Sequence, residues 1–170
     1  MAARDGASVL EQLRTLHPGI AKRSDEIEAT RYLPKDIAAN LVAAGAFKLC
    51  VPREIGGVQG TALELMTAIE EMSIADSAAG WCLMIGATSG ITAAYLKPEA
   101  AREIHGDPNT VTGGIFAPRG KAIKDTDGYV VSGTWQWASG SSHCQWMKGG
   151  CIVYEDGKPR MLREGVPDIR

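Results

Sequence analysis

The residues best able to do acid–base, nucleophilic or metal chemistry in this 170-residue chain are three histidines and four cysteines. The histidines (His17, His105 and His143) lie far apart and form no HxxxH or HExxH pattern, and the cysteines form no CxxC pair. A zinc site needs about four clustered Cys or His ligands, so buried, reduced thiols and no metal are expected. His143 is a candidate acid or base because its ordinary pKa is near neutral, although a histidine in a surface loop is the more frequent case.

Around residue 137 the chain carries aromatic and small polar side chains that suit ligand binding. Trp135 and Trp137 alternate, so on a β-strand both side chains face the same side, where they either fill a core or line a site. Ser139 stands in Ala-Ser-Gly-Ser-Ser and by itself is typical of a turn. The motifs GxGxxG, GxxxxGK(S/T) and GxSxG are absent from the sequence, so a Rossmann fingerprint, a P-loop and a nucleophile elbow find no support.

The first two thirds of the chain have the apolar spacing that predicts helices. A first helix is expected over residues 8–29, with a kink or break at His17-Pro18-Gly19. Proline suits the first turn of a helix and glycine its end, so a second helix is expected from Pro34 to Gly45.

Capping and turn signals divide the following segment. The pair Gly56-Gly57 allows positive φ and close backbone approach, which predicts a loop. Thr61 and Glu64 have the spacing of a capping box and begin a further helix. Asp76 is expected to cap the next helix, which ends at Lys97-Pro98 and is followed by one short helix.

Residues 77–96 carry no charge and are long enough to cross a bilayer. Alanine, glycine, serine and threonine dominate this segment and supply little transfer energy, so it is expected to be a buried helix with close neighbours and not a membrane span. The net charge of -2, with no basic stripe, gives no reason to expect nucleic acid as a partner. A cytoplasmic location without membrane contact is expected.

Past Asn109 the sequence changes to short β-strands, with hairpin signals at Asp127-Gly128 and Asp156-Gly157. Strands are predicted at residues 111–116, 121–124, 129–132, 135–138 and 151–154. The fold class is therefore α+β, with an all-helical domain over residues 1–107 and an incomplete, barrel-like β domain over residues 108–170. About five strands with open edges and no covering helix predict a truncated second domain.

Three stretches in register carry a resemblance to a known family: VPREIGG (51–57) with LELMTAIEEMSIADS (63–77), GGIFAPRGKA (113–122), and GYVVSGTWQWASG (128–140) closed by Trp146. Together they resemble the acyl-CoA dehydrogenase superfamily. Dehydrogenases of this family usually carry Thr-Glu-Pro before a Gly-Ser-Asp turn, and Trp-Ile-Thr-Asn further on. The Phe-x-Pro-x-Gly-x-Ala and Trp-x-Trp-x-Ser-Gly forms are more similar to the two-component, group D flavin-dependent monooxygenases of the same fold.

The resemblance implies a flavin cofactor, FAD or FMN, used in its reduced form. Position matching implies that Trp137 lies against the isoalloxazine ring and that Ser139 approaches flavin N5. Ile115, Phe116 and Ala117 would supply backbone groups and an apolar edge. The implied reaction is hydroxylation of an aromatic or polycyclic small molecule with O2, with reduced flavin delivered by a separate flavin reductase.

The family's C-terminal helical bundle is absent from this chain, and the resemblance places the catalytic residues, the other flavin face and most of the oligomer interface there. The chain alone is therefore expected to be inactive, and the full-length protein to be a homo-oligomer. Two alternatives stay open: an acyl-CoA dehydrogenase that forms an α,β-double bond in a CoA thioester, and a non-catalytic interaction module that retains the fold.

Overall fold

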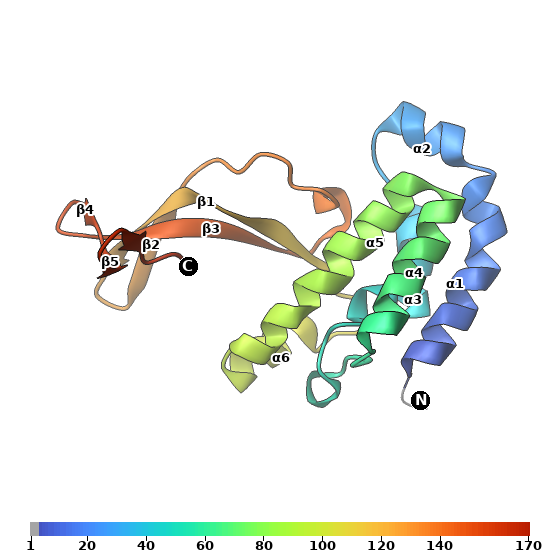
Figure 1. Ribbon diagram of the computed structural model, residues 1–170, viewed down its shortest axis with the longest axis horizontal. Helices are drawn as coiled ribbons and strands as arrows, with labels where there is room; N and C mark the ends of the chain where they lie inside the picture. Colours follow the sequence, from blue (N-terminus) through green and yellow to red (C-terminus); the bar gives the residue numbers. More distant parts are fainter. Residues whose placement is uncertain (1–3) are drawn as a thin grey trace. The chain divides into compact units, whose positions relative to one another are not determined.

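The computed structural model describes residues 4–170 and consists of helices followed by strands (Figure 1). The α-helices are α1 (Gly6–Ala21), α2 (Ser24–Thr30), α3 (Lys35–Ala44), α4 (Ala62–Ala75), α5 (Ser77–Ser89) and α6 (Pro98–His105). Short 3-10 helices are η1 (Ala46–Lys48), η2 (Arg53–Ile55), η3 (Gly90–Tyr95) and η4 (Ser141–His143). The strands are β1 (Thr112–Asp125), β2 (Gly128–Ser132), β3 (Trp146–Glu155), β4 (Lys158–Pro159), β5 (Met161–Arg163) and β6 (Val166–Pro167). The predicted α+β class is confirmed.

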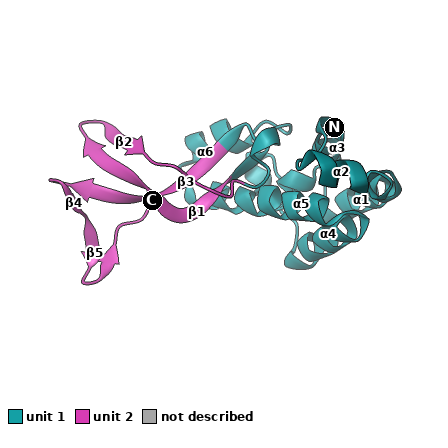
Figure 2. Ribbon diagram, turned by 90° about the horizontal axis from the view of Figure 1, so that it is seen from above, with its two compact units in different colours: residues 1–113, 139–146 teal, residues 114–138, 147–170 magenta. Residues whose placement is uncertain are grey.

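The chain divides into two compact units, coloured separately in Figure 2. The helical unit contains the chain up to Gly113 together with Ser139–Trp146, and the sheet unit contains Gly114–Ala138 together with Met147–Arg170. Residues 139–146 therefore belong to the helical unit, although the segments before and after them belong to the sheet unit. The predicted boundary between domains 1–107 and 108–170 stays a prediction.

Three helices form the centre of the helical unit: α4 packs against both α1 and α5 (Figure 1). Val9 and Leu13, four residues apart on α1, are fully buried, as helical periodicity requires for one apolar face. Met72 of α4 and Leu83 of α5 are equally buried in the same core. Each such side chain contributes about 1.5–3 kcal/mol of transfer free energy, so these contacts dominate the stability of the unit.

The predicted helix signals at Gly45, Thr61 and Asp76 are confirmed. Gly45 ends α3 in the left-handed conformation with φ 81°. The Thr61 hydroxyl accepts a hydrogen bond from the Glu64 amide, and the Glu64 carboxylate accepts one from the Thr61 amide. Asp76 accepts a 2.9 Å hydrogen bond from the Ala79 amide and a 2.6 Å hydrogen bond from the Ser24 hydroxyl, so it both starts α5 and holds the beginning of α2.

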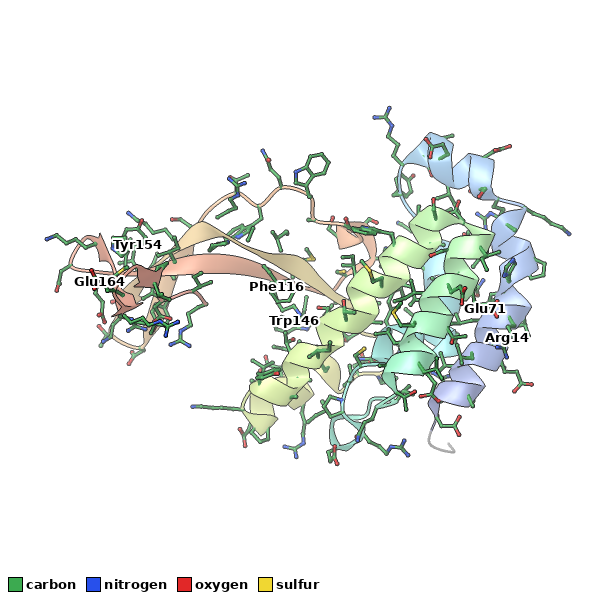
Figure 3. All side chains as sticks on the ribbon, viewed as in Figure 1. Arg14, Glu71, Phe116, Trp146, Tyr154 and Glu164 are labelled. Atoms are coloured by element: carbon green, nitrogen blue, oxygen red, sulfur yellow. The ribbon has the colours of Figure 1, made fainter. Side chains whose placement is uncertain are left out.

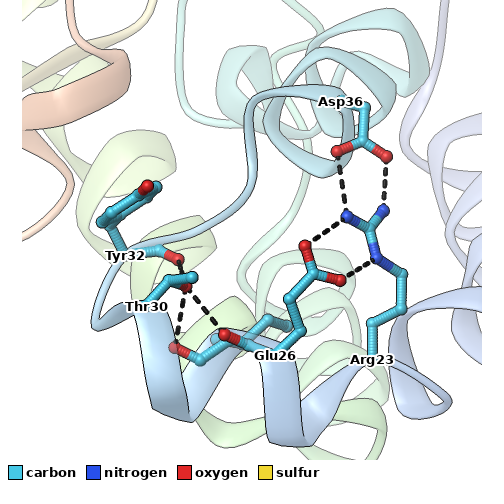
Figure 4. A network of polar contacts seen from close by, with 6 residues as sticks. Arg23, Glu26, Thr30, Tyr32 and Asp36 are labelled. Carbon is cyan, nitrogen blue, oxygen red and sulfur yellow. Dashed lines mark hydrogen bonds and ion pairs between the residues drawn. The ribbon is translucent and has the colours of Figure 1, made fainter.

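The expected break at His17-Pro18-Gly19 is absent, because α1 runs through Pro18 to Ala21. Beyond the proline the helical hydrogen bonding goes on, with the Lys22 amide donating to the Pro18 carbonyl, and the next turn buries Ile20 in the core. The chain turns at Lys22-Arg23 instead. There the Arg23 guanidinium binds the Glu26 carboxylate at 2.7 Å and also the Asp36 carboxylate (Figure 4). This network ties α2 to the start of α3.

Glycines in α5 allow neighbouring backbones to approach, as its small-residue composition predicted. A Cβ atom on Gly80 would lie 2.0 Å from the Ser73 hydroxyl oxygen, and one on Gly86 would lie 2.4 Å from the Phe47 ring. Helix α5 ends at Ser89 and continues as 3-10 helix to Tyr95, so the single helix predicted up to Lys97 is shorter than expected. Within residues 4–170, no helix has the length and hydropathy that crossing a bilayer requires.

The main sheet of the second unit has the strand order β2-β1-β3-β4, and β5 pairs with β6 separately. Asp156 and Gly157 both have positive φ (48° and 77°) and form the two-residue turn between β3 and β4, which confirms that hairpin signal. In the other hairpin Asp125 pairs with Gly128, so the turn lies one residue earlier than the signal. The predicted strands 111–116 and 121–124 are one continuous strand, β1.

The small core of the sheet unit contains Ala122, Cys151 and Val153, with Trp135 packed against them. The Trp135 indole Nε1 donates a 2.9 Å hydrogen bond to the Gly150 carbonyl, which satisfies its polar group as it packs. Trp135 is therefore a core residue, one of the two interpretations that its sequence allowed.

Candidate functional site

A pocket of about 210 Å³ opens beside β1 in the sheet unit. It is lined by Gly114, Ile115, Ala117, Arg119, Gln136 and Trp137. Side chains at alternate positions of a strand share one face, so Ile115, Ala117 and Arg119 reach the pocket from the same side of β1. The short segment after Gly133 brings the other wall, which includes Trp137.

Trp137 presents its indole ring almost completely to solvent, with 91% of the residue exposed. Its φ of 65° lies in the left-handed region, which residues other than glycine rarely adopt. The strand predicted over 135–138 is therefore wrong: the left-handed backbone breaks the alternation, so Trp135 and Trp137 do not share the face of a strand. A strained backbone that exposes a large ring is the kind of feature that binding sites maintain.

Glycines allow the two central strands to approach behind this pocket. A Cβ atom on Gly114 would lie 2.5 Å from the Lys148 carbonyl oxygen, and one on Gly150 would lie 2.4 Å from the Phe116 carbonyl oxygen. A larger residue at either position would push β1 away from β3. The glycines therefore fix where β1 presents its pocket face.

Phe116 lies on the opposite face of β1 from the pocket. Its side chain, labelled in Figure 3, is 76% exposed. The Lys148 ammonium lies 5.7 Å from the centroid of its ring, within the range of a cation–π contact. Its side chain is not among those that line the pocket, although its backbone belongs to the same strand.

Of the five residues predicted to bind cofactor, the structure brings the side chains of Ile115, Ala117 and Trp137 together at the pocket. Ser139 does not line it and belongs to the segment that joins the helical unit. It is half-buried and follows Trp137 by two residues. The role of all five residues in cofactor binding stays a prediction.

His143 is half-buried in η4, which corrects its interpretation as a surface-loop histidine. Its ring centroid lies 5.6 Å from that of Phe47, with 32° between the planes. Burial lowers the pKa of His143, which favours the neutral imidazole at pH 7. Nδ1 is buried and finds no hydrogen-bond partner among the described residues, and the ring packs against Phe47 in the helical unit.

Metal chemistry finds no support within residues 4–170, where no three His, Cys, Asp or Glu side chains are grouped as ligands. The four cysteines are free thiols, but only Cys151 is buried, whereas the other three are half-buried, so the expected burial holds for one of them. Burial raises the pKa of Cys50, Cys82 and Cys151, so these thiols are poor nucleophiles near pH 7.

The chemistry of the pocket fits one face of a flat aromatic ligand. The Trp137 ring offers a stacking surface, Ile115 and Ala117 add apolar edges, and Gln136 adds a donor and an acceptor. Pockets that enclose a drug-sized ligand usually measure about 300–1,000 Å³, so a 210 Å³ pocket holds part of a ligand as large as a flavin. The residues therefore fit a flavin ring as one wall of a larger site.

Sequence reasoning missed three lining residues, Gly114, Arg119 and Gln136. Arg119 follows Ala117 by two positions, so strand alternation would have identified it if residues 111–124 had been read as one strand. Gln136 could not be found in this way, because it precedes a residue with positive φ.

The comparisons with known proteins agree with this fold. Residues 13–102 match the family model "Acyl-CoA dehydrogenase, N-terminal domain". The chain is 32% identical over 157 residues to HsaA of Mycobacterium tuberculosis (strain ATCC 25618 / H37Rv), the oxygenase subunit of a flavin-dependent monooxygenase, a match that covers 92% of this chain and 40% of that relative. It is 31% identical over 165 residues to a pigment production hydroxylase of Rhodococcus erythropolis, covering 94% of this chain and 42% of the relative.

Solved structures show the same architecture. The crystal structure of the M. tuberculosis HsaA monooxygenase superposes with a TM-score of 0.87 over 92% of this chain and 43% of that one, at 32% identity. XiaF of Streptomyces sp., solved with FADH2 and glycerol, superposes with a TM-score of 0.85 at 22% identity over 92% of this chain and 40% of that one, a likeness of fold. The chain thus spans about two fifths of the length of the relatives it matches. Since the family model covers more than half of the chain, the protein belongs to the acyl-CoA dehydrogenase N-terminal domain family, as the sequence resemblance predicted.

Proposed function

We propose that this chain forms one wall of the flavin site of a flavin-dependent monooxygenase that hydroxylates an aromatic or polycyclic small molecule. The observation that carries the proposal is Trp137, which lines the pocket with Ile115 and Ala117, is 91% exposed and has a strained backbone. An exposed indole beside apolar residues forms a flat surface that gains stability when an aromatic ring covers it.

Each residue has a defined task in this proposal. Trp137 stacks on one face of the isoalloxazine, and Ile115 and Ala117 keep water from its edge. Ser139 lies outside the pocket, two residues after Trp137, and in this proposal its hydroxyl and backbone amide approach flavin N5. The bound flavin, FAD or FMN, supplies the redox chemistry with O2.

The relatives favour a monooxygenase over the two alternatives. The oxygenase subunit HsaA and the pigment production hydroxylase are joined by an indole-3-acetate monooxygenase of Pseudomonas putida, 34% identical over 121 residues. None of these names describes a CoA thioester as substrate. A relative from Rhizobium sp. is named as the oxygenase component of an FADH(2)-dependent resorcinol hydroxylase. The word "component" supports the proposal that a separate reductase delivers reduced flavin.

A complete site in this proposal needs a second wall, because the 210 Å³ pocket is open and Trp137 is covered by nothing in the sheet unit. We infer that the longer protein supplies it and forms the predicted homo-oligomer. The 170-residue chain by itself should bind flavin weakly and should not hydroxylate. Reduced FMN mixed with the chain, O2 and a phenol should yield hydrogen peroxide without hydroxylated product, and efficient hydroxylation would contradict this expectation.

Flavin binding is testable by equilibrium titration of the purified chain with FMN up to millimolar concentrations, followed by flavin fluorescence. Trp137→Ala should weaken binding about fivefold or more, because stacking on an aromatic side chain is worth about 1–3 kcal/mol per ring. Trp81→Ala is the matched control, since Trp81 is another exposed tryptophan and lies on α5. Equal affinity for the wild type and Trp137→Ala, or no binding by the wild type, would contradict the proposed function.

A further inference from the structure

We propose that Arg119, together with Gln136, forms an anion-binding end of the Trp137 pocket and takes the phosphate of a flavin nucleotide. This inference rests on the proposed function, and it adds a recognition element that separates phosphorylated flavins from neutral ones. It follows from the position, charge and lack of partners of one arginine.

Ile115, Ala117 and Arg119 occupy one face of β1 and line the same pocket. A strand rises about 3.3 Å per residue, so Arg119 begins about 13 Å along the strand from Ile115. A flavin carries its phosphate at the end of a flexible five-carbon arm. A ring stacked near Ile115 and Trp137 can therefore place its phosphate at the end where Arg119 lies.

The charge of Arg119 is also unpaired among the described residues. Within residues 4–170 the Arg119 side chain makes no hydrogen bond, ion pair or cation–π contact, whereas five of the other seven cations of the sheet unit make at least one. Lys124 pairs with Glu155 at 3.1 Å, for example, and Lys121 lies over the Tyr154 ring. All five N–H donors of Arg119 are thus available, and the planar guanidinium binds phosphate oxygens in pairs.

The surroundings of Arg119 also favour an anion. No Asp or Glu lines the pocket, so no carboxylate neutralises the arginine or repels a phosphate there. The second cavity of the same unit, about 610 Å³, differs in character because Asp125, Glu155 and Asp156 line it. The side-chain amide of Gln136, which lines the same pocket, adds a neutral donor.

The test compares three probes, FMN, riboflavin and inorganic phosphate, on the wild-type chain, Arg119→Gln and Arg163→Gln. Riboflavin keeps the ring and the arm but lacks the phosphate. Arg163→Gln removes the same charge from an exposed residue of β5 that does not line the pocket, so it measures the effect of net charge alone. Binding is measured by isothermal titration at low ionic strength and again in 0.5 M salt.

The wild type should bind FMN roughly threefold to tenfold more tightly than riboflavin, and salt should reduce this difference. Arg119→Gln should bind both flavins with the weaker, riboflavin-like affinity, whereas Arg163→Gln should behave as the wild type. Inorganic phosphate should compete with FMN and leave riboflavin binding unchanged.

Two failures are distinguishable. If FMN and riboflavin bind equally, and Arg119→Gln changes neither, the anion site is overturned and the proposed flavin wall stands. If phosphate binds at Arg119 but neither flavin binds, the anion belongs to a ligand other than flavin, and both proposals are overturned. Equal losses in Arg119→Gln and Arg163→Gln would likewise overturn the anion site, since net charge would then explain the preference.

Discussion

Lys48 of η1 donates a hydrogen bond from its buried Nζ to the main-chain carbonyl oxygen of His105, 2.7 Å away at the end of α6. A helix ends with carbonyl groups that have no partner within the helix, and a cation there also interacts favourably with the helix dipole. Lys48 thus holds α6, the last helix before β1, against η1. Only 5% of Lys48 is exposed, so its charge is costly to keep.

Stability should depend on pH through Lys48. Burial, partly offset by the Asp107 carboxylate, lowers the pKa of Lys48 from 10.5 to about 8. Between pH 8 and 10.5 the unfolded chain therefore binds more protons than the folded chain, and the unfolding free energy should rise with pH in this window, by at most about 3 kcal/mol. Below pH 8 this gain is absent. Urea denaturation at pH 7, 8, 9 and 10 measures it.

Lys48→Met is the control for other groups that titrate in the same range. The difference in unfolding free energy between the wild type and Lys48→Met should change steadily from pH 8 to pH 10. A difference that stays constant over this range would show that Lys48 keeps an ordinary pKa.

Trp137→Gly should be more stable than Trp137→Ala, and it should bind flavin more weakly than the wild type. Glycine adopts φ 65° without strain, and the 91% exposed indole contributes little burial, so the unfolding free energy should rise by about 1 kcal/mol relative to Trp137→Ala. Thermal unfolding and FMN titration of the same samples give both values. A glycine variant no more stable than the alanine variant would argue that the left-handed backbone carries no strain.

Gly80→Ala should destabilise the helical unit by about 2 kcal/mol or more, although alanine favours helices. The new Cβ atom would lie 2.0 Å from the Ser73 hydroxyl oxygen and 2.8 Å from the Ser73 Cα atom, so α4 and α5 must separate. Gly19→Ala in α1 is the matched control, because nothing lies within 4 Å of its Cβ position, and it should be neutral or up to about 1 kcal/mol more stable. Chemical denaturation of both variants checks the order, and equal effects would contradict the close packing.

Asp168→Ala should loosen the sheet unit. Asp168 is 1% exposed, accepts hydrogen bonds from the Arg160 guanidinium (2.8 Å from Nε) and pairs with Arg170 at 3.1 Å. Its removal leaves a small cavity and two arginines without their anion, and should cost about 2–3 kcal/mol. Glu164→Ala removes an exposed carboxylate from the turn before β6 and should stay within about 0.5 kcal/mol. Hydrogen exchange at the Val153 amide, which donates to the Asp168 carbonyl, reports the change locally.

Local signals in the sequence were sufficient for most of the helical unit. Gly45, the Thr61–Glu64 pair and Asp76 act through residues within one helical turn, so their outcome depends little on the rest of the fold. The continuation of α1 through Pro18 and the early end of α5 could not be predicted, because tertiary packing decides both. Strands β4, β5 and β6 are two or three residues long and were missed, since two residues carry no periodicity.

The candidate site was predictable only in part. Family resemblance pointed to Ile115, Ala117 and Trp137, which line one pocket, and to Phe116, whose side chain lies on the other face. The positive φ of Trp137 had no signal, because such a backbone is typical of glycine or asparagine and not of tryptophan. The alternation of Trp135 and Trp137 therefore predicted a strand wrongly, because the extended conformation ends at Trp137.

Strand β1 runs without interruption from Thr112 to Asp125, so the number of residues within it determines which face each side chain occupies. Deleting a single amino acid before Ile115 would rotate every following side chain to the reverse surface. Phe116 would then enter the pocket, while Arg119 would leave it. Length changes in this stretch of the gene are thus tolerable in pairs of codons, or singly where a β-bulge absorbs the odd residue.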